Sequence, residues 1–194
     1  MTLTIRPMTD GDAPVVCELV QRNYEGVIAE YHSPAVVARL GAEVTPEWVR
    51  GQREWSQVFV AEDDHGIVAT VALADFGASS VHRHCVRQCF VRADLHRQGI
   101  GTRIMAHVID VARAGGADHL RLPSRRNAIP FYQRVGFVVD LEQPDAADEI
   151  TWMTMELSGR PAEQLCRADA PQISDRLRSG GSRRRSAQRH TDGR

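Results

Sequence analysis

The sequence contains no lysine, so all 24 of its basic side chains are arginines. A functional demand would not remove every lysine from a surface, and we interpret the absence as a coding bias. It does exclude a Walker phosphate-binding loop, which requires a Gly-Lys-Ser/Thr sequence. Because 25 acidic side chains oppose the arginines, the formal net charge is −1. The chain as a whole therefore has no bulk attraction to nucleic acid or to an anionic membrane.

Cysteine is scarce, and long apolar runs are missing. Cys17, Cys85, Cys89 and Cys166 are scattered and form no C-x-x-C pair, which excludes the usual redox motif and a zinc ribbon. No run approaches the ~18 apolar residues that a membrane span requires. The first residues lack a charged-then-apolar leader. We therefore expect a cytoplasmic protein with reduced thiols and no membrane partner.

The length of 194 residues, of which 42% are hydrophobic, suits one domain with a tail. The periodic pattern ends at Ser158, and the segment beyond it carries nine arginines against four acids. Such a segment cannot bury enough apolar surface to offset the entropy of ordering. We predict a domain over residues 1–157 and a disordered arginine-rich tail over residues 158–194. A solvated tail is favoured over one that binds RNA, DNA or an acidic protein.

Within residues 1–157, apolar periodicity predicts strands and helices in a mixed order. Asp10, Ser33 and Thr45 are the expected helix caps. The expected strands cover residues 2–6, 56–62, 67–75, 84–92, 118–122, 137–141 and 149–157. The expected helices cover residues 10–29, 34–40, 46 onward, 100–114 and 128–135. This order predicts an α/β fold with a mixed sheet in one domain.

A glycine-containing turn joins the strand at 84–92 to the helix at 100–114. Gly99 and Gly101 flank Ile100, so the backbone can approach a ligand without an intervening Cβ. Unpaired amides at a helix start form an anion site. The amides of Gln98 to Thr102 would therefore surround a diphosphate. A tight turn without a ligand is the alternative, and a dinucleotide fingerprint is weaker because Ile104 stands where a third glycine is required.

A second segment, Asn127 to Phe137, begins about thirty residues later. Asn127 suits an N-cap, and Pro130 would be the third helical residue. The spacing of the apolar residues turns much of this helix inward and places Tyr132 on the inner face. A buried tyrosine hydroxyl needs a partner, so Tyr132 is either a satisfied core residue or a group that faces a ligand.

Together the two segments resemble the GNAT superfamily of N-acetyltransferases. That family combines Arg/Gln-x-x-Gly-x-Gly/Ala at a helix start with a later Asn-Ala and Tyr-x-x-x-Gly-Phe. Here residues 96–101 read His-Arg-Gln-Gly-Ile-Gly, and residues 127–137 contain Asn-Ala, Phe-Tyr and Gly-Phe. His96 stands where the family usually has Arg or Gln, and the main phosphate contacts that the resemblance implies are backbone amides. The resemblance covers residues 2 to about 157 and implies a mixed, mostly antiparallel sheet that splays between its fourth and fifth strands, with helices on both faces.

The resemblance also implies an acetyl-CoA-dependent transfer to a primary amine of a small molecule or peptide, without a metal. Tyr132 would protonate the CoA thiolate as general acid, because a tyrosine keeps its proton at neutral pH. The Val91 N–H would donate to the carbonyl oxygen. The residues that would bind the cofactor are Cys89, Phe90, Val91, His96, Arg97, Gln98, Gly99, Ile100, Gly101, Thr102, Asn127 and Tyr132.

The general base and the acceptor site are not determined by the sequence. Gln88 stands where related enzymes sometimes place a carboxylate, but an amide cannot accept the amine's proton. Members of the family often pair into homodimers, and no interface can be located here. The candidate bases are Glu25, Glu30 and Glu54, and the candidate acceptor-site aromatics are Tyr24, Tyr31, Trp48, Trp55 and Phe76.

Three other readings stay open from the residues. The first is an acyl-CoA-binding module without turnover. The second is a nucleic-acid-associated protein that acts through the basic tail. The third is a metal site at His82 and His84 with Cys85 or Cys89, against which a polar strand start with a buried thiol is the preferred interpretation.

Overall fold

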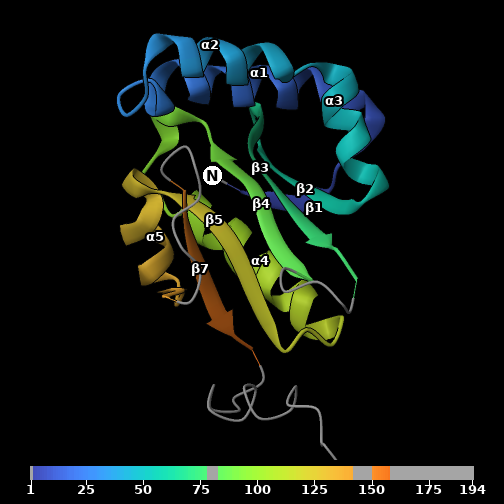
Figure 1. Cartoon of the computed structure of the whole chain (residues 1–194). Coiled ribbons are helices and arrows are strands. Elements are labelled where there is room, and N and C mark those ends of the chain that lie inside the picture. Colours follow the sequence, from blue (N-terminus) through green and yellow to red (C-terminus); the bar gives the residue numbers. More distant parts are fainter. Residues whose placement is uncertain (1, 78–82, 142–149, 158–194) are drawn as a thin grey trace, which may run out of the picture. The chain divides into compact units, whose positions relative to one another are not determined.

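The computed structural model describes residues 2–77, 83–141 and 150–157 (Figure 1). Seven strands form one sheet in the order β1-β2-β3-β4-β5-β7-β6. Neighbouring strands are antiparallel except for β4 and β5, which are parallel. The predicted mixed, mostly antiparallel sheet is therefore confirmed. The strands are β1 (Thr4–Pro7), β2 (Ser56–Asp63), β3 (Gly66–Asp75), β4 (His84–Val91), β5 (His119–Arg125), β6 (Val138–Val139) and β7 (Ile150–Glu156).

Helices cover both faces of the sheet, as predicted. Figure 1 shows α1, α2 and α3 together at the top of the view and α4 behind the strands. Val16 and Val20 of α1 pack on Val60 and Ala72, and we call this side the α1 face. Ile104, Met105 and Val108 of α4 pack on Leu120 and Leu122, and we call that side the α4 face. The helices are α1 (Ala13–Asn23), α2 (Pro34–Glu43), α3 (Pro46–Gly51), α4 (Ile100–Ala114) and α5 (Ile129–Arg134).

In the described part of the chain, no helix combines the length and the apolar character needed to cross a membrane.

Local sequence signals set several helix starts. The Ser33 hydroxyl accepts a hydrogen bond from the Val36 amide at 3.4 Å, and the Thr45 hydroxyl accepts one from the Trp48 amide at 3.1 Å. Each of these two residues caps the helix that follows it, as predicted.

The prediction that Asp10 caps the first helix is wrong. Asp12 accepts hydrogen bonds from the amide of Thr9 at 2.7 Å and from its hydroxyl at 2.8 Å. Asp10 instead lies in the short 3₁₀ turn Asp10–Asp12 and pairs with Arg53. The Asp12 carboxylate thus pairs the Thr9 amide, which would otherwise lack a partner at the start of the helix, and this contact fixes the start of the turn at Thr9.

The first helix is also shorter than predicted. It ends at Asn23 and is followed by a π-helical turn, Tyr24–Ile28, in which the Ala29 amide donates to the Tyr24 carbonyl at 3.0 Å. A π-turn widens the helix locally and carries no clear sequence signature, and such turns are frequent at functional sites. The apolar spacing therefore predicted one continuous helix to residue 29.

The sheet splays between β4 and β5, as the family resemblance implies. Among the described residues the two strands share a single pairing, Cys85 with Arg121, and then diverge. On its other edge, β4 carries a bulge, because its pairing with β3 passes from Ala72↔Arg87 to Thr70↔Phe90. Gln88 adopts a left-handed φ of 52° there. A bulge bends its strand, so β4 leaves a gap beside β5.

Candidate functional site

A cavity of about 790 Å³ extends from the glycine turn, through the gap between β4 and β5, to the π-turn after α1. Most of the predicted cofactor-binding residues line it: Cys89, Phe90, Val91, His96, Arg97, Gly99, Gly101, Thr102, Asn127 and Tyr132. Two predicted residues do not. The Gln98 side chain is exposed, and Ile100 is buried in the core at 3% exposure, as the first apolar position of α4 should be.

The two glycines of the turn are required for different reasons. Gly99 caps α4 with a φ of 81°, a conformation that favours glycine, and its carbonyl accepts the Arg103 amide at 3.0 Å. Gly101 has a helical backbone, but a Cβ there would lie 3.2 Å from the Phe131 ring. The first glycine therefore permits the turn, and the second permits the close approach of α5 to α4. The amides of the first turn of α4 begin at the cavity wall, at the positive end of the helix dipole.

The edge of β4 that faces the gap presents backbone groups to the cavity. The Arg92 amide donates to the Val68 carbonyl at 2.8 Å. Hydrogen-bonded and non-bonded pairs alternate along an antiparallel ladder, so the N–H and C=O of Val91 point away from β3 and into the gap. His96 Nε2 lies 2.9 Å from this carbonyl oxygen and donates to it. The Val91 N–H is thus directed at the cavity.

Tyr132 lies on α5, is 9% exposed and packs against the rings of Phe131 and Phe137 at 5.0 and 6.0 Å between centroids. Burial raises the pKa of Tyr132 well above its ordinary value, and the neighbouring Cys89 thiol raises it further. Burial also raises the pKa of Cys89 to about 12, against an opposing effect of the Tyr132 hydroxyl. Both groups therefore keep their protons at neutral pH, on the same cavity as the glycine turn.

The start of the second segment differs from the prediction. Asn127 is not the N-cap, because it lies in a 3₁₀ turn, Arg126–Ala128, and α5 begins at Ile129 with Ala128 in the capping position. Pro130 is the second helical residue, where its missing N–H costs nothing. The extra turn leaves the Asn127 side chain on the cavity wall.

The cavity passes through the sheet from one face to the other. On β4, Val86, Cys89 and Val91 pack with the core of the α4 face. Arg87 lies opposite Ala72 of the α1 face, and Phe90 meets Tyr24 edge-on at 5.6 Å. This alternation is reset at Gln88, whose Nε2 donates to Gln52 Oε1 at 2.7 Å.

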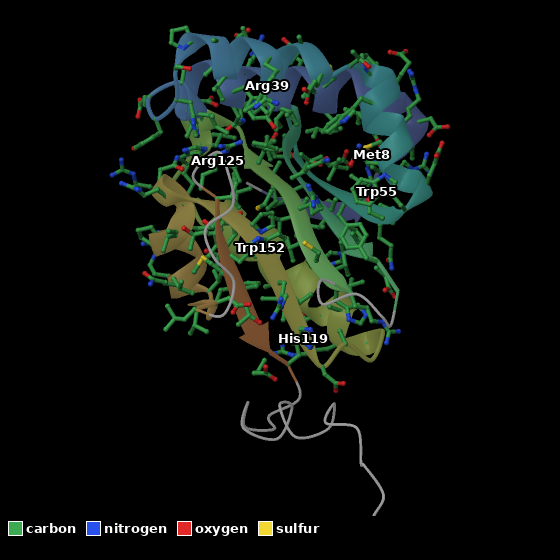
Figure 2. The ribbon with its side chains drawn as sticks, viewed as in Figure 1. Met8, Arg39, Trp55, His119, Arg125 and Trp152 are labelled. Atoms are coloured by element: carbon green, nitrogen blue, oxygen red, sulfur yellow. The ribbon has the colours of Figure 1, made fainter. Side chains whose placement is uncertain are left out.

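The fifth strand shows the same division between the faces. Leu120 and Leu122 belong to the core of the α4 face. Because side chains alternate along a strand, Pro123 and Arg125 lie on the α1 face. Arg125 Nη1 donates to His32 Nε2 at 2.9 Å. Figure 2 shows Arg125 at the end of β5 nearest α1 and α2, with His119 at the opposite end.

The cavity wall is strongly basic. Its described residues include four arginines and one histidine but no aspartate or glutamate: Arg87, Arg97, Arg125, Arg134 and His96. The sequence did not lead us to predict Arg87, Arg125 or Arg134 as site residues. The alternation of Leu120 and Leu122 predicts the face of Arg125, whereas no sequence signal predicts the bulge that puts Cys89 and Val91 on the other face from Arg87.

The candidate bases and most of the candidate acceptor-site aromatics lie elsewhere. Glu25, Glu30 and Glu54 are exposed and do not belong to the described cavity wall. Among the aromatics, Tyr24 lines the cavity. Trp55 and Phe76 instead stack on each other, with ring centroids 5.8 Å apart.

His82, one member of the alternative metal site, lies outside the described residues. Among the residues that the structure does describe, no group of three or more His, Cys, Asp or Glu side chains could hold a metal ion.

Comparison with known proteins relates this geometry to a family. Residues 54–139 match the family model described as an acetyltransferase (GNAT) domain. No curated protein is similar enough in sequence to match the chain.

Solved structures with the same fold share little sequence with the chain. PaiA N-acetyltransferase from Thermoplasma acidophilum, in complex with coenzyme A, has a TM-score of 0.69 at 16% identity, over 80% of this chain and 99% of that one. A GCN5-related N-acetyltransferase from Rhodopseudomonas palustris has a TM-score of 0.68 at 20% identity, over 81% and 97%. A GNAT family acetyltransferase from Elizabethkingia anophelis with acetyl-CoA bound has a TM-score of 0.56 at 17% identity, over 80% and 98%.

Proposed function

We propose that this chain, which carries a GNAT acetyltransferase domain, is an N-acetyltransferase that moves the acetyl group of acetyl-CoA to a primary amine of a small molecule or peptide. One observation carries the proposal. A single cavity joins the glycine turn at the start of α4 to Tyr132 beside the gap between β4 and β5. A diphosphate at one end of this cavity and a thioester at the other match the two ends of the pantetheine arm of acetyl-CoA.

The residues of the cavity fit this cofactor. The first-turn amides of α4 and the side chains of Arg97 and Arg134 offer donors and positive charge to phosphates. The edge of β4 from Cys89 to Val91 can pair with the amide-containing arm of the cofactor, and Asn127 can hydrogen-bond to it. The coenzyme A and acetyl-CoA bound to the Thermoplasma and Elizabethkingia proteins of the same fold support this assignment.

In the proposed reaction, the amine nitrogen attacks the carbonyl carbon of the thioester. A C–N bond forms, the C–S bond breaks, and the sulfur leaves with the bonding electron pair. The Val91 N–H donates to the carbonyl oxygen as its negative charge grows. Tyr132 gives its proton to the thiolate, and the proton that the amine loses restores the phenol. The net products are an N-acetylated amine and free CoA thiol.

Replacement of Tyr132 by phenylalanine tests the role of the hydroxyl. We expect Tyr132→Phe to lower kcat by at least about 100-fold, the usual contribution of a positioned general acid. The dissociation constant for coenzyme A should stay within about twofold of wild type, because the ring still fills its place. CoA release with a panel of amines measures the rate, and product mass identifies the amine that was acetylated.

Tyr31→Phe is the matched control, since Tyr31 is exposed and lies outside the described cavity wall. Full activity of Tyr132→Phe would refute the general-acid role. A wild-type protein that binds coenzyme A but releases none from acetyl-CoA with any amine would instead be an acyl-CoA-binding module.

A further inference from the structure

We infer that the acceptor amine also carries a carboxylate, as an amino acid does, and that Arg87 binds this carboxylate on the α1 face of the gap. The inference rests on the proposed function and names its substrate class. It follows from the distribution of charge along the cavity, which differs between the two faces of the sheet.

The positive charges of the cavity divide into two groups. His96, Arg97 and Arg134 line its wall together with the glycine turn, where the cofactor phosphates are proposed to bind. Arg87 and Arg125 lie on the α1 face, across the sheet from Cys89 and Val91. A phosphate group at the glycine turn therefore does not explain the second pair of arginines.

Arg87 is half-buried and has no carboxylate partner within ion-pair distance in the described part of the chain. The nearby Cys85 thiol does not supply a counter-charge, because burial raises the pKa of Cys85 to about 11, with Arg87 opposing the rise. A partly buried guanidinium that faces a cavity without a carboxylate beside it is suited to bind an anion. A substrate carboxylate would supply that anion through paired N–H···O bonds.

Two further groups lie around the same position. Tyr24, from the π-turn, lies close to both arginines. Burial raises the pKa of Tyr24, the positive charges of Arg125 and Arg87 lower it, and the negative charge of Glu43 raises it. The Nε2 of Gln88 donates to Gln52 Oε1. The side-chain oxygen of Gln88 therefore remains to accept a hydrogen bond from the N–H of the acceptor amine. The cavity thus offers a hydrogen-bond acceptor for the amine of the substrate and a cation for its carboxylate.

This arrangement disfavours the other acceptor classes. A simple alkylamine or a polyamine brings only positive charge to a wall that holds two arginines and, among its described residues, no acid. A free amino acid and a peptide with an acidic side chain share the required chemistry, and the test includes one of each.

The first test compares acceptors that differ only in the carboxyl group. Protein amino acids, their carboxamides and the corresponding amines without the carboxyl are assayed for CoA release, together with alanyl-glutamyl-amide as the peptide. We expect kcat/KM for the best acid to exceed that for its carboxamide by about 10- to 100-fold, as loss of a charged hydrogen-bond partner predicts. Equal or better use of the carboxamide or amine would overturn the inference.

The second test removes the cation. Arg87→Gln should raise the KM for the carboxylate acceptor by about 10- to 100-fold and leave the KM values for its carboxamide and for acetyl-CoA within about twofold. Arg87→Lys should recover part of the loss. Arg22→Gln, on the exposed side of α1, is the matched control. An equal loss for acid and carboxamide would show that Arg87 is structural.

A binding measurement separates failure of the inference from failure of the proposed function. If no amine supports turnover, the proposed function is wrong. Calorimetric titration of the CoA-bound protein with the amino acid and with its carboxamide then decides the inference alone. Tighter binding of the acid, lost in Arg87→Gln, supports it, and equal or absent binding of the two refutes it.

Discussion

At the scale of single residues, the chain uses glycine where a side chain would strain the backbone and where one would fill space. Gly99 holds a φ of 81° with nothing within 4 Å of an added Cβ, and Gly41 lies in α2 with equally open space but without a left-handed φ. The two positions differ in backbone conformation and not in crowding. A substitution by alanine therefore isolates the cost of that conformation.

We expect Gly99→Ala to lower the free energy of unfolding by about 1–2 kcal/mol, the cost of a left-handed alanine. Gly41→Ala should raise it by about 0.5–1 kcal/mol, because alanine is the better helix former. Urea denaturation of the two variants and wild type measures both values. If both variants changed the free energy of unfolding by the same amount and in the same direction, the left-handed conformation of Gly99 would not explain the effect of Gly99→Ala.

The residue scale also shows what the sequence can predict of the site. Gly99, Gly101 and Tyr132 were predictable because each lies in a motif with local spacing. The place of Arg87 across the sheet from Cys89 and Val91 was not predictable, because unbroken alternation would put residues 87, 89 and 91 on one face and the bulge at Gln88 separates them. A one-residue shift moves a strand's side chains to the other face, and the neighbouring residues in the sequence give no signal that predicts this shift.

At the scale of elements, one arginine joins the first strand to its neighbours. Arg6 of β1 pairs with Asp12 at 2.7 Å, in the turn before α1, and with Glu62 of β2 at 2.7 Å. The Asp12 side chain is 14% exposed and also accepts the Thr9 amide. The Arg6 hydrogen bond is the largest cause that holds the pKa of Asp12 far below its ordinary value.

Asp12→Asn should lower the free energy of unfolding by about 1–3 kcal/mol at pH 7, because charged hydrogen bonds to Arg6 and Thr9 are lost. A carboxyl with a lowered folded-state pKa stabilises above its unfolded pKa of about 3.9, and this stabilisation is lost as the pH falls toward the folded value. The difference between wild type and variant should therefore shrink below about pH 4. Denaturation curves at pH 7 and pH 3 test the sign.

The control for this prediction is Glu18→Gln, which breaks an exposed pair with Arg22 on α1. Such a pair contributes about 0.3–0.5 kcal/mol. If Asp12→Asn costs no more than the control at pH 7, the contacts of Asp12 do not stabilise the start of α1.

Some element boundaries were predictable from a local cap or turn, although Asp10 and Asn127 are not the caps that the sequence predicts. Ser33 and Thr45 begin their helices as predicted, and the β2–β3 hairpin turns before Gly66, whose φ is 110°. The π-turn after α1 and the extension of β5 to Arg125 were missed. The extension of β5 depends on a partner distant in the sequence, since Arg125 pairs with Ile150 of β7. The π-turn is held by the local hydrogen bond from the Ala29 amide to the Tyr24 carbonyl and carries no clear sequence signature.

At the scale of the whole molecule, the order of elements was predictable and the order of strands in the sheet was not. β7 lies between β5 and β6, so the last strand is inserted between two that precede it in the chain. Periodicity identifies each strand but carries no information on its neighbours. The implied splay came from family resemblance, and the structure confirms it.

The basic cavity predicts how cofactor binding responds to salt. Because Arg97 and Arg134 line the wall with the glycine turn, coenzyme A should bind several-fold more weakly as sodium chloride rises from 0.05 to 0.5 M, since salt screens exposed charges. Pantetheine lacks the phosphates and should show little change. Calorimetric titrations with both compounds make the comparison. Equal salt dependence of the two dissociation constants would refute the proposal that the phosphates bind at the glycine turn.

Because the cavity crosses the sheet, the two reactants of the proposed transfer reach the reaction centre by separate routes. In the proposed reaction, the donor would lie along the α4 face, and the acceptor would approach from the side of the π-turn. Enlarging the acceptor end should therefore admit bulkier amines and leave the donor end of the cavity unchanged.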